Sequence, residues 1–540
     1  MDNVSQLPTP QEIVDNALQS LGVKTRHSPE SLTETAHWLT NPGLDDPQLT
    51  DLTALPFVTI DNPDSRDLDQ ALLICKSDGS NDAITIESTV EDNSDTGYRV
   101  LYALADASYY ITPGSALFAE ALARGTTYYT PLMAAAMLPV DLSEGLISLN
   151  PGVDRRAVVF DMRVDKRGSV TRTDVIRGKI RSQAKLSYES VQRWLDDYSE
   201  PVNPYDASLL LLRELGDILI ANATQRGVVT FDRTEARIIT TGRPERFEAR
   251  VRERYDTERY NEQISLMCNM QGAELLLGLS GHSDAVQAIF RVHEAPLRKS
   301  LNRLRETLDE FAAQQDDPSL WQWQTGQSLA DYVDALPDNE DFTRRVKSVQ
   351  RQIMQAQRAS TFTTEAGEHH ALKAASYARF SSPMREVVGI FTHKELLEAL
   401  YGGAADNSTG KDELLRTAVI DAANEARKTQ RKLDKAVELA ALSSVFAIEL
   451  AGQSPETRIG TIVDIRKDRL YVSLDEMAVD IKLYKDAIEA QFHTEYDFQS
   501  VRIQPKDESS PVWQIGQAVK IVLDDFDTER KRYSFVLSAG

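Results

Sequence analysis

Four aspartates lie close together in the segment TIDNPDSRDLDQAL, which covers residues 59–72 and continues a short apolar run. They are Asp61, Asp64, Asp67 and Asp69. Carboxylates this dense raise one another's pKa unless a cation or basic groups neutralise them. Mg²⁺ takes oxygen ligands, and a pair of such ions can stabilise the attacking and leaving oxygens of a phosphodiester displacement. The alternative is a solvated, Asp-rich turn that caps backbone amides, and the spacing by itself leaves both interpretations open.

The surrounding sequence predicts a mixed α+β domain that positions this cluster. From residue 57 to about 173, the runs FVTI, YRVLYALAD and AVVFDMRVD indicate strands separated by Pro, Gly and Asp, with one helix at 115–124. From about 205 to 400 the apolar spacing is helical, and 411–447 predicts a long helix lying on the main domain. The helices expected in the middle of the chain span 206–222, 257–279, 295–314 and 340–359.

The two ends of the chain differ from this central part. Residues 10–21 and 29–40 show helical spacing, with Ser28 and Pro29 as a helix start, and 41–55 is rich in Pro and Asp, as linkers are. Residues 456–540 alternate apolar and polar positions in five short runs, which favours a small barrel of the OB type. The predicted division is therefore a short helical segment at 1–50, a main domain at 51–455 and a barrel at 456–540.

Composition excludes several classes of protein. The formal charge is −23 over 540 residues, which argues against a protein that coats nucleic acid with a positive exterior, although a confined basic channel stays compatible with it. Two cysteines, Cys75 and Cys268, exclude a disulfide framework and a Cys-rich zinc site. We see neither a signal peptide at the start nor an apolar run long enough to span a membrane, and we expect a cytoplasmic monomer.

The aspartate segment resembles the signature of the ribonuclease II (RNB) family of exoribonucleases. In that pattern an Asp is followed by further aspartates six, eight and nine residues on; Asp61, Asp67 and Asp69 match, whereas Gln70 stands at the fourth position. Other blocks match in the same order along the chain. They are LADASYYITPGSALFAEALARGTTYYTP (104–131), MLPVDLSEGLISLNPGVDR (137–155), RGVVTFD (226–232) with Glu235, IFRVHEAP (289–296) and HHALKAASYARFSSPMR (369–385).

This resemblance implies an RNB catalytic domain with a mixed or antiparallel sheet and surrounding helices, followed by an OB-fold RNA-binding barrel. It implies hydrolysis of single-stranded RNA from the 3′ end to nucleoside 5′-monophosphates with Mg²⁺, for which Mn²⁺ is a possible substitute. The family usually carries two cold-shock domains ahead of this domain, and the 50 residues found here are too few for one. The implied catalytic residues are Asp61, Asp67, Asp69, Gln70 and Arg385, the first three also as metal ligands; the implied RNA-binding residues are Tyr129, His369, Tyr377, Ser382 and Arg385.

The segment SSPMREVV predicts a helix start, with Ser382 as the N-cap and Pro383 as the first helical residue. Arg385 would then lie in the first turn, where a cation opposes the helix dipole, and a phosphate shared with the helix end would explain it. The family usually has a second basic residue after Arg385 and an Asp four residues beyond it. This chain has Glu386 and Gly389 there, and we expect Glu386 to repel an anion.

Two alternative interpretations follow from these departures. The first is a family member that binds RNA and has weakened or lost catalysis, because Gln70 carries no charge and ligates metal poorly. The second, compatible with the acidity, is a protein-binding scaffold that no longer binds RNA. Packed side chains are also an open interpretation for His369, Tyr377 and the later His393, and solvated helix faces for Arg351 and Arg358.

Overall fold

The computed structural model describes residues 9–77, 96–197, 200–231, 235–241, 246–252, 254–281, 286–402, 411–452, 456–476, 479–527 and 532–537. Within these residues helices and sheets alternate along the chain, and the expected α+β class is confirmed. No helix in the described ranges is long and apolar enough to cross a membrane. Asp232 of the predicted RGVVTFD block lies outside them.

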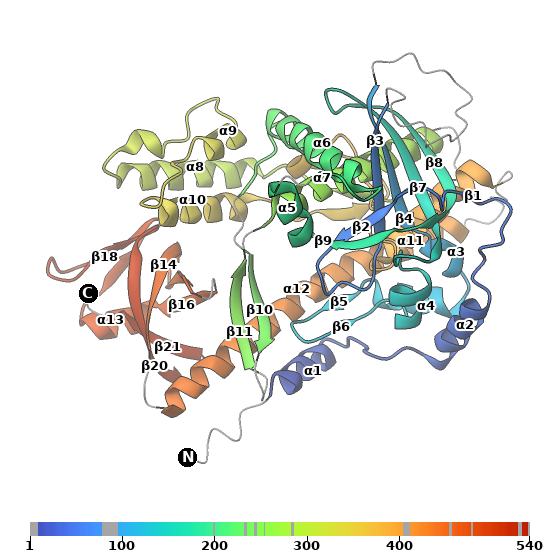
Figure 1. Cartoon of the computed structure of the whole chain (residues 1–540). Helices are drawn as coiled ribbons and strands as arrows, with labels where there is room; N and C mark the ends of the chain where they lie inside the picture. The colour runs from blue at the N-terminus through green and yellow to red at the C-terminus, as the bar shows by residue number, and fades with distance from the viewer. Residues whose placement is uncertain are drawn as a thin grey trace.

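A seven-stranded sheet forms the centre of the larger half (Figure 1). Its order is β1-β8-β7-β4-β3-β2-β9, with parallel pairs only at the two edges, β1 with β8 and β2 with β9. The inner strands are antiparallel, as expected for runs that are consecutive in sequence. The strands are β1 Thr50–Asp51, β2 Val58–Asp61, β3 Gln70–Lys76, β4 Thr96–Ala105, β7 Asp154–Asp165, β8 Val170–Arg181 and β9 Ala184–Ser187.

Both faces of this sheet are buried, which is why its strands are continuous apolar runs. Alternate side chains of β3 face opposite cores: Leu72 and Ile74 join one cluster, Ala71 and Leu73 the other. The first cluster includes α5, α6 and α7, and the second includes α3, α4, α11 and the start of α12. These helices are α3 Ala107–Tyr110, α4 Ala116–Arg124, α5 Tyr188–Asp196, α6 Asp206–Gln225, α7 Asp256–Ser280, α11 Val387–Tyr401 and α12 Lys411–Gly452.

The smaller half combines the C-terminal strands with helices from the middle of the chain. One sheet has the order β16-β15-β14-β20-β21 and a second the order β17-β18-β19. The described pairings do not close the first sheet into a barrel. α8, α9 and α10 share one hydrophobic cluster with this sheet, so residues 298–356 pack with the C-terminal part (Figure 1). The elements are α8 Arg298–Ala313, α9 Leu329–Asp334, α10 Thr343–Ala356, β14 Thr457–Arg466, β15 Arg469–Leu474, β16 Asp480–Tyr484, α13 Lys485–Phe492, β17 Tyr496–Phe498, β18 Arg502–Pro505, β19 Trp513–Gln514, β20 Ala518–Asp527 and β21 Arg532–Leu537.

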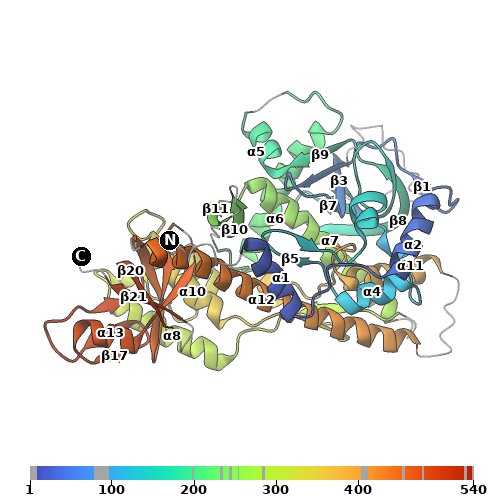
Figure 2. The ribbon, with the colours of Figure 1, turned by 90° about the horizontal axis from the view of Figure 1, so that it is seen from below.

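Helix α12 connects the two halves. Its 42 residues run from beside α11 in the larger half to the C-terminal sheet (Figure 2). A helix of this length spans about 60 Å. Its middle packs on α1 Pro10–Ser20, where Leu433 and Val437 join Val14 and Leu18 in one apolar cluster. The predicted helix at 411–447 is therefore present and extends a few residues further.

The remaining short elements differ little from the expected pattern. Ser28 caps α2 Pro29–Thr40 as predicted, with its hydroxyl accepting from Ser31 N. Within the predicted linker at 41–55, β1 pairs with β8, so this segment is tied to the main sheet. The other strands are β5 Tyr128–Tyr129, β6 Ala134–Ala135, β10 Glu235–Thr241, β11 Arg246–Arg252, β12 Phe290–Val292 and β13 Thr361–Thr363.

The predicted helix start at Ser382 is wrong. Helix α11 begins at Val387, and the segment before it is a turn in which Ser382 O accepts from the amides of Arg385 and Glu386. Met384 N donates to Asp69 Oδ1 in the main sheet and not to a cap at Ser382. The long-range contact overrides the local Ser-Pro pattern, and Arg385 lies just ahead of the helix.

Candidate active site

The loop between β2 and β3 carries the aspartates. Asp61 ends β2, Gln70 begins β3, and residues 62–69 connect them. Ser148 fixes this loop: its hydroxyl accepts from Leu68 N at 2.9 Å and donates to Arg66 O at 2.8 Å. Leu149 N donates to Leu68 O at 3.0 Å. The Ser148–Leu149 block therefore sets the backbone from which Asp67 and Asp69 project.

Asp69 is the buried member of the cluster, with 2% of its surface exposed. Its Oδ1 accepts from Met384 N at 3.0 Å and its Oδ2 from Arg385 Nε at 2.5 Å. Burial raises the pKa of Asp69 to about 6, and the charge of Arg385 opposes that shift. Arg385 is thus the cation that this structure places against the predicted catalytic carboxylate.

The other two carboxylates lie close enough to interact with this pair. Asp67 Oδ2 is 3.9 Å from Arg385 Nε. Burial raises the pKa of Asp67, Arg385 opposes the shift, and the charge of Asp61 adds to it. The guanidinium of Arg385 therefore lies against Asp69 and near Asp67, and the charge of Asp61 acts on it as well. The donor set fits a hard divalent ion, because oxygen ligands are present and their mutual repulsion is what such an ion would relieve.

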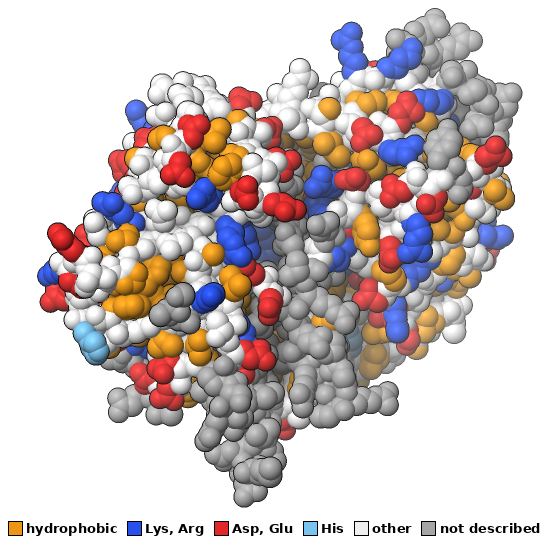
Figure 3. Space-filling model, turned by 60° about the vertical axis from the view of Figure 1, so that its left-hand side comes forward, with side chains coloured by type: hydrophobic (Ala, Val, Ile, Leu, Met, Phe, Trp, Pro, Cys, Tyr) orange, Lys and Arg blue, Asp and Glu red, His pale blue; other side chains and the backbone are white. Residues whose placement is uncertain are grey.

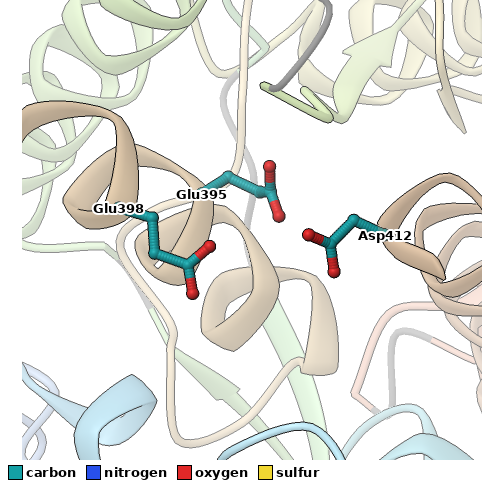
Figure 4. A group of neighbouring side chains, drawn as sticks. All are labelled: Glu395, Glu398 and Asp412. Carbon is teal, nitrogen blue, oxygen red and sulfur yellow. The ribbon is translucent and has the colours of Figure 1, made fainter. Parts of the chain in front are cut away.

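A second carboxylate group lies outside this loop. Glu395 and Glu398 of α11 face Asp412 of α12 (Figure 4), and their oxygens are close enough to hold an ion. Lys394 already occupies this role: its Nζ lies 2.9 Å from Glu395, 2.8 Å from Glu398 and 3.6 Å from Asp412. Glu395 also accepts from Gln287 N at 2.7 Å. This group is therefore an ion-pair network that ties α11 to α12.

Tyr129 stands beside Asp67 with an exposed ring. It is 45% exposed, and its hydroxyl donates to Asp67 Oδ2 at 3.4 Å. Gln430 of α12 holds its backbone through two hydrogen bonds of 3.0 Å, one to Tyr129 N and one to Tyr129 O. Sequence reasoning missed Gln430, because nothing in a polar helix face marks one glutamine among its neighbours. An exposed aromatic ring at a carboxylate site can stack on a base.

Gln70 does not face solvent as a weak metal ligand would. Its Nε2 donates to Ser381 O at 2.9 Å, and its Oε1 accepts from the hydroxyl of Tyr102. Asn269 of α7, which is fully buried, holds the same segment: its Oδ1 accepts from Phe380 N at 2.7 Å and Ser381 N at 3.1 Å. Gln70 and Asn269 together fix residues 380–381 of the segment that leads to Arg385.

Replacing Gln70 with Glu or with the family's Asp is expected to lower stability by about 1–3 kcal/mol, because Ser381 O loses its donor and a charge is added beside Asp69. We expect no gain in RNA cleavage from either change. Urea unfolding of both variants, with single-turnover cleavage rates on the same samples, checks this. A faster variant of unchanged stability would show that Gln70 weakens the site.

Three of the predicted RNA-binding residues are buried. They are His369, Tyr377 and Ser382, and all three belong to the segment that leads to Arg385. The hydroxyl of Tyr377 accepts from Asn269 Nδ2 at 3.0 Å, and Ser382 Oγ accepts from Arg379 at 3.1 Å. Their contacts indicate a role in positioning Arg385, and in this structure they offer no surface to a ligand.

Glu386 does not act as the isolated negative charge that the sequence suggested. Its carboxylate accepts from Arg379 Nε at 3.0 Å, and Arg379, Arg291 and Arg385 all lower its pKa against the effect of burial. The expectation that Glu386 repels an anion is therefore wrong: its charge is matched by Arg379. Gly389 lies within α11, where an added Cβ would come within 2.8 Å of Pro383 Cα, so close packing of the turn explains the glycine.

Acid is expected to destabilise the fold through two buried histidines. Burial lowers the pKa of His369 and of His393 from 6.5 to about 4. The unfolded chain therefore takes up protons first, so this stability is present above pH 6.5 and is lost as the pH falls toward about 4. Each histidine should cost roughly 3 kcal/mol over that window.

Urea unfolding at a series of pH values measures this loss. A His393→Gln variant should show a shallower pH dependence than the natural chain. His37, which is exposed, gives the matched control, and His37→Gln should leave the dependence unchanged. Equal slopes in all three proteins would contradict the assignment.

A basic cleft of about 730 Å³ lies between α6 and α7 on one side and α9, α10 and the turn at 370–373 on the other. Arg226, Arg254, Arg259, Arg358 and Lys373 line it, with Glu262 as an acidic member. Figure 3 shows the face where the two halves meet as hollowed, with Lys and Arg side chains on both sides of the hollow. Arg351 is not part of the cleft, because it pairs with Asp480 at 2.5 Å and ties α10 to β16.

Several matching blocks of the sequence are structural. Arg124 is buried and donates to the carbonyls of Lys24 and Arg26, both at 2.6 Å, and so holds the N-terminal segment on α4. Gly125 follows with φ 74°, and a Cβ there would come within 2.7 Å of Ala422 O on α12. Glycine is required both by this conformation and by the close approach of the two helices.

Carboxylates in a sheet loop, an arginine against the buried one and an exposed tyrosine beside them define the class: an α+β protein with an acidic site at the end of its main sheet. The RNB domain family matches residues 49–402, more than half of the chain. The chain belongs to the RNB domain family, and the resemblance inferred from the sequence is confirmed.

Curated relatives extend this match to most of the chain. Ribonuclease R of Escherichia coli (strain K12) is 27% identical over 499 residues, which is 90% of this chain and 57% of that protein. Ribonuclease R of Aquifex aeolicus is 28% identical over 468 residues, 86% of this chain and 63% of that protein. The chain thus spans about six tenths of the length of these relatives.

Solved structures share the fold. Mycoplasma genitalium RNase R in complex with ribose-methylated single-stranded RNA has a TM-score of 0.81 at 21% identity, covering 98% of this chain and 78% of that one. Yeast Ssd1, described as a pseudonuclease, has a TM-score of 0.64 at 13% identity, covering 95% and 58%. A protein named as a ribonuclease and one described as a pseudonuclease therefore share this fold, and function has to be argued from the site.

Proposed function

We propose that this protein is a hydrolytic exoribonuclease that degrades single-stranded RNA in the 3′-to-5′ direction and releases nucleoside 5′-monophosphates. The observation that carries the proposal is the arrangement of Asp61, Asp67, Asp69 and Arg385 beside the exposed ring of Tyr129, in a chain of the RNB domain family. The activity printed in the names of the ribonuclease R relatives agrees with it.

Asp61, Asp67 and Asp69 would hold Mg²⁺, or Mn²⁺ in its place. When bound, the ion supplies a nucleophilic water at neutral pH and stabilises charge on the phosphate. Arg385 keeps Asp69 ionised in spite of its burial and stands ready to bind a phosphate oxygen. Tyr129 would stack on the 3′-terminal bases and place the phosphodiester beside the carboxylates, with its backbone fixed by Gln430.

Incubation of the purified protein with 5′-labelled single-stranded RNA, over a titration of Mg²⁺ and of Mn²⁺, tests the proposal. We expect shortening from the 3′ end and nucleoside 5′-monophosphates as products. An RNA that stays intact at every metal and enzyme concentration would exclude the nuclease function.

A second candidate is an RNA-binding protein with weak or lost catalysis. Gln70 favours it, since this position carries an amide committed to Ser381 and Tyr102, and the fold is shared with a described pseudonuclease. Filter binding that weakens steeply with salt, without shortening of the RNA, would support this candidate. Absence of binding at low salt would instead leave the protein-scaffold interpretation.

The domain roles remain proposals. Residues 51–455 would carry catalysis, and 456–540 would bind RNA as an OB-type module, where Arg469 and Arg532 lie over the ring of Tyr484 at 5.3 and 3.8 Å. A monomeric state and a cytoplasmic location also stay predictions. Sedimentation equilibrium at micromolar concentration tests the first of these.

A further inference from the structure

Two arginines from distant parts of the sequence converge on one serine. Arg291 of β12 donates from Nε to Ser360 Oγ at 3.1 Å. Arg427 of α12 donates to the same Oγ at 3.1 Å and to Ser360 O at 2.6 Å. Because both donate to Ser360 Oγ, the two guanidinium groups lie close to each other.

Both guanidinium groups also lie over the ring of Phe362. The guanidinium carbon of Arg291 lies 5.9 Å from the ring centroid and that of Arg427 lies 5.8 Å from it. Phe362 itself is buried, and Asn424 of α12 fixes its backbone through hydrogen bonds of 3.0 Å to both its N and its O. The ring of Phe362 and the hydrogen bonds to Ser360 therefore restrict the side-chain conformations of both arginines.

One carboxylate, Glu386, opposes the positive charge of the pair, but without an ion pair to either arginine. Within the described residues, neither Arg291 nor Arg427 forms an ion pair, and the carboxylate of Glu386, whose charge acts on both, is hydrogen-bonded to Arg379. Burial lowers the pKa of both arginines, to about 10 for Arg427. The charge of Arg379 lowers both pKa values further, that of Arg291 also lowers the pKa of Arg427, and Glu386 opposes these shifts. Two partly buried guanidinium groups at one hydroxyl disfavour the folded state unless an anion joins them.

This pair borders the candidate active site. Glu386 interacts electrostatically with Arg291 and Arg427 on one side and with Arg385 on the other. Arg385, the preceding residue in the chain, holds Asp69. Both arginines keep part of their surface exposed, so an anion can reach them from solvent.

We propose that Arg291 and Arg427 form a second phosphate-binding site, which holds a backbone phosphate of the RNA upstream of the one placed at Asp69 and Arg385. This inference rests on the proposed function and adds a contact that fixes the strand without taking part in hydrolysis. Paired guanidinium groups suit a phosphate, since their N–H donors match its oxygens. Because α12 and β12 are both needed to build it, the site exists only in the folded chain.

Neutral-linkage RNA tests the site directly. Binding of a single-stranded oligonucleotide is measured in EDTA, so that no cleavage occurs, with one methylphosphonate linkage moved stepwise from the 3′ end. At one upstream position the natural chain should lose about 10-fold in affinity, because a charge-assisted contact is removed. Arg427→Gln should bind all-phosphate RNA about 10-fold more weakly and show no further loss at that position.

Two further variants secure the interpretation. Arg291→Gln should reproduce the effect of Arg427→Gln, so that one misfolded variant does not decide the outcome. Arg431→Gln removes a neighbouring exposed cation of α12 that makes no contact with Ser360, and it should leave the position-specific loss intact. If the loss in affinity from the methylphosphonate linkage and the loss from the arginine substitution multiply at every position of the linkage, the two act independently and the proposal is overturned.

A probe without RNA separates this proposal from the nuclease function. If the chain binds no RNA, inorganic phosphate should still protect Arg291 and Arg427 from phenylglyoxal, as read by mass spectrometry of the modified peptides. Protection of these two but not of Arg431 supports an anion site in a protein of another activity. Equal modification of all three with and without phosphate refutes the site.

Discussion

Asp69→Asn is expected to lower the rate of RNA shortening by about 10³-fold or more, while RNA binding changes little. Asn keeps the size of the side chain and can still accept from Met384 N, so the turn that carries Arg385 should persist. It removes the negative charge that faces Arg385 and that would hold the metal. A change of this size corresponds to about 4 kcal/mol in the activation free energy.

Single-turnover rates on 5′-labelled RNA, together with filter binding in EDTA, measure the two effects separately. Asp64 gives the matched control, because it belongs to the same loop but is exposed. Asp64→Asn should retain activity within a factor of about 2, in keeping with the small effects of surface substitutions. An Asp69→Asn variant that cleaves RNA normally would refute the catalytic role of this carboxylate.

Replacing Arg385 is expected to give the second large effect. Arg385→Ala should lower kcat by about 10²–10³-fold, the range seen when one preorganised donor to a developing charge is removed. KM should change less, because stacking on Tyr129 and contacts further along the strand remain. Arg385→Lys should recover only part of the rate, since an ammonium cannot reproduce the guanidinium fork.

The steady-state split between kcat and KM checks this expectation. Arg66 is the matched control: it is a cation in the aspartate loop with a mostly exposed side chain, 3.6 Å from Glu144. Arg66→Gln should leave kcat within about 2-fold. Equal losses of kcat in the Arg66 and Arg385 variants would mean that the rate depends on net positive charge near the site. That result would refute a specific role of Arg385.

Local sequence patterns were sufficient for most elements of the fold. Continuous apolar runs bounded by Pro, Gly and Asp predicted the strands of the central sheet, and 3.6-residue spacing predicted α6, α7, α10 and α12 within a few residues of their observed ends. A prediction failed where a contact with a residue distant in sequence outweighed the local preference of the chain. Ser382–Pro383 has the composition of a helix start, yet Asp69 binds Met384 N and the helix begins at Val387. The five-stranded C-terminal sheet is present where the barrel was expected, and its described pairings do not close it.

By itself the sequence determined the chemistry that the chain can hold: the spacing of Asp61, Asp67 and Asp69 identified a carboxylate loop and, with the other matching blocks, the family and Arg385. The tertiary structure decided which charges meet. It brings Arg385 to Asp69 across 316 positions and Gln430 to Tyr129 across 301. It also pairs Glu386 with Arg379 and leaves Arg291 and Arg427 together on Ser360. A local pattern reports the periodicity of one element, whereas a charge finds its partner only when several elements pack. The sequence could therefore name the carboxylates and Arg385, but not which of these groups contact one another.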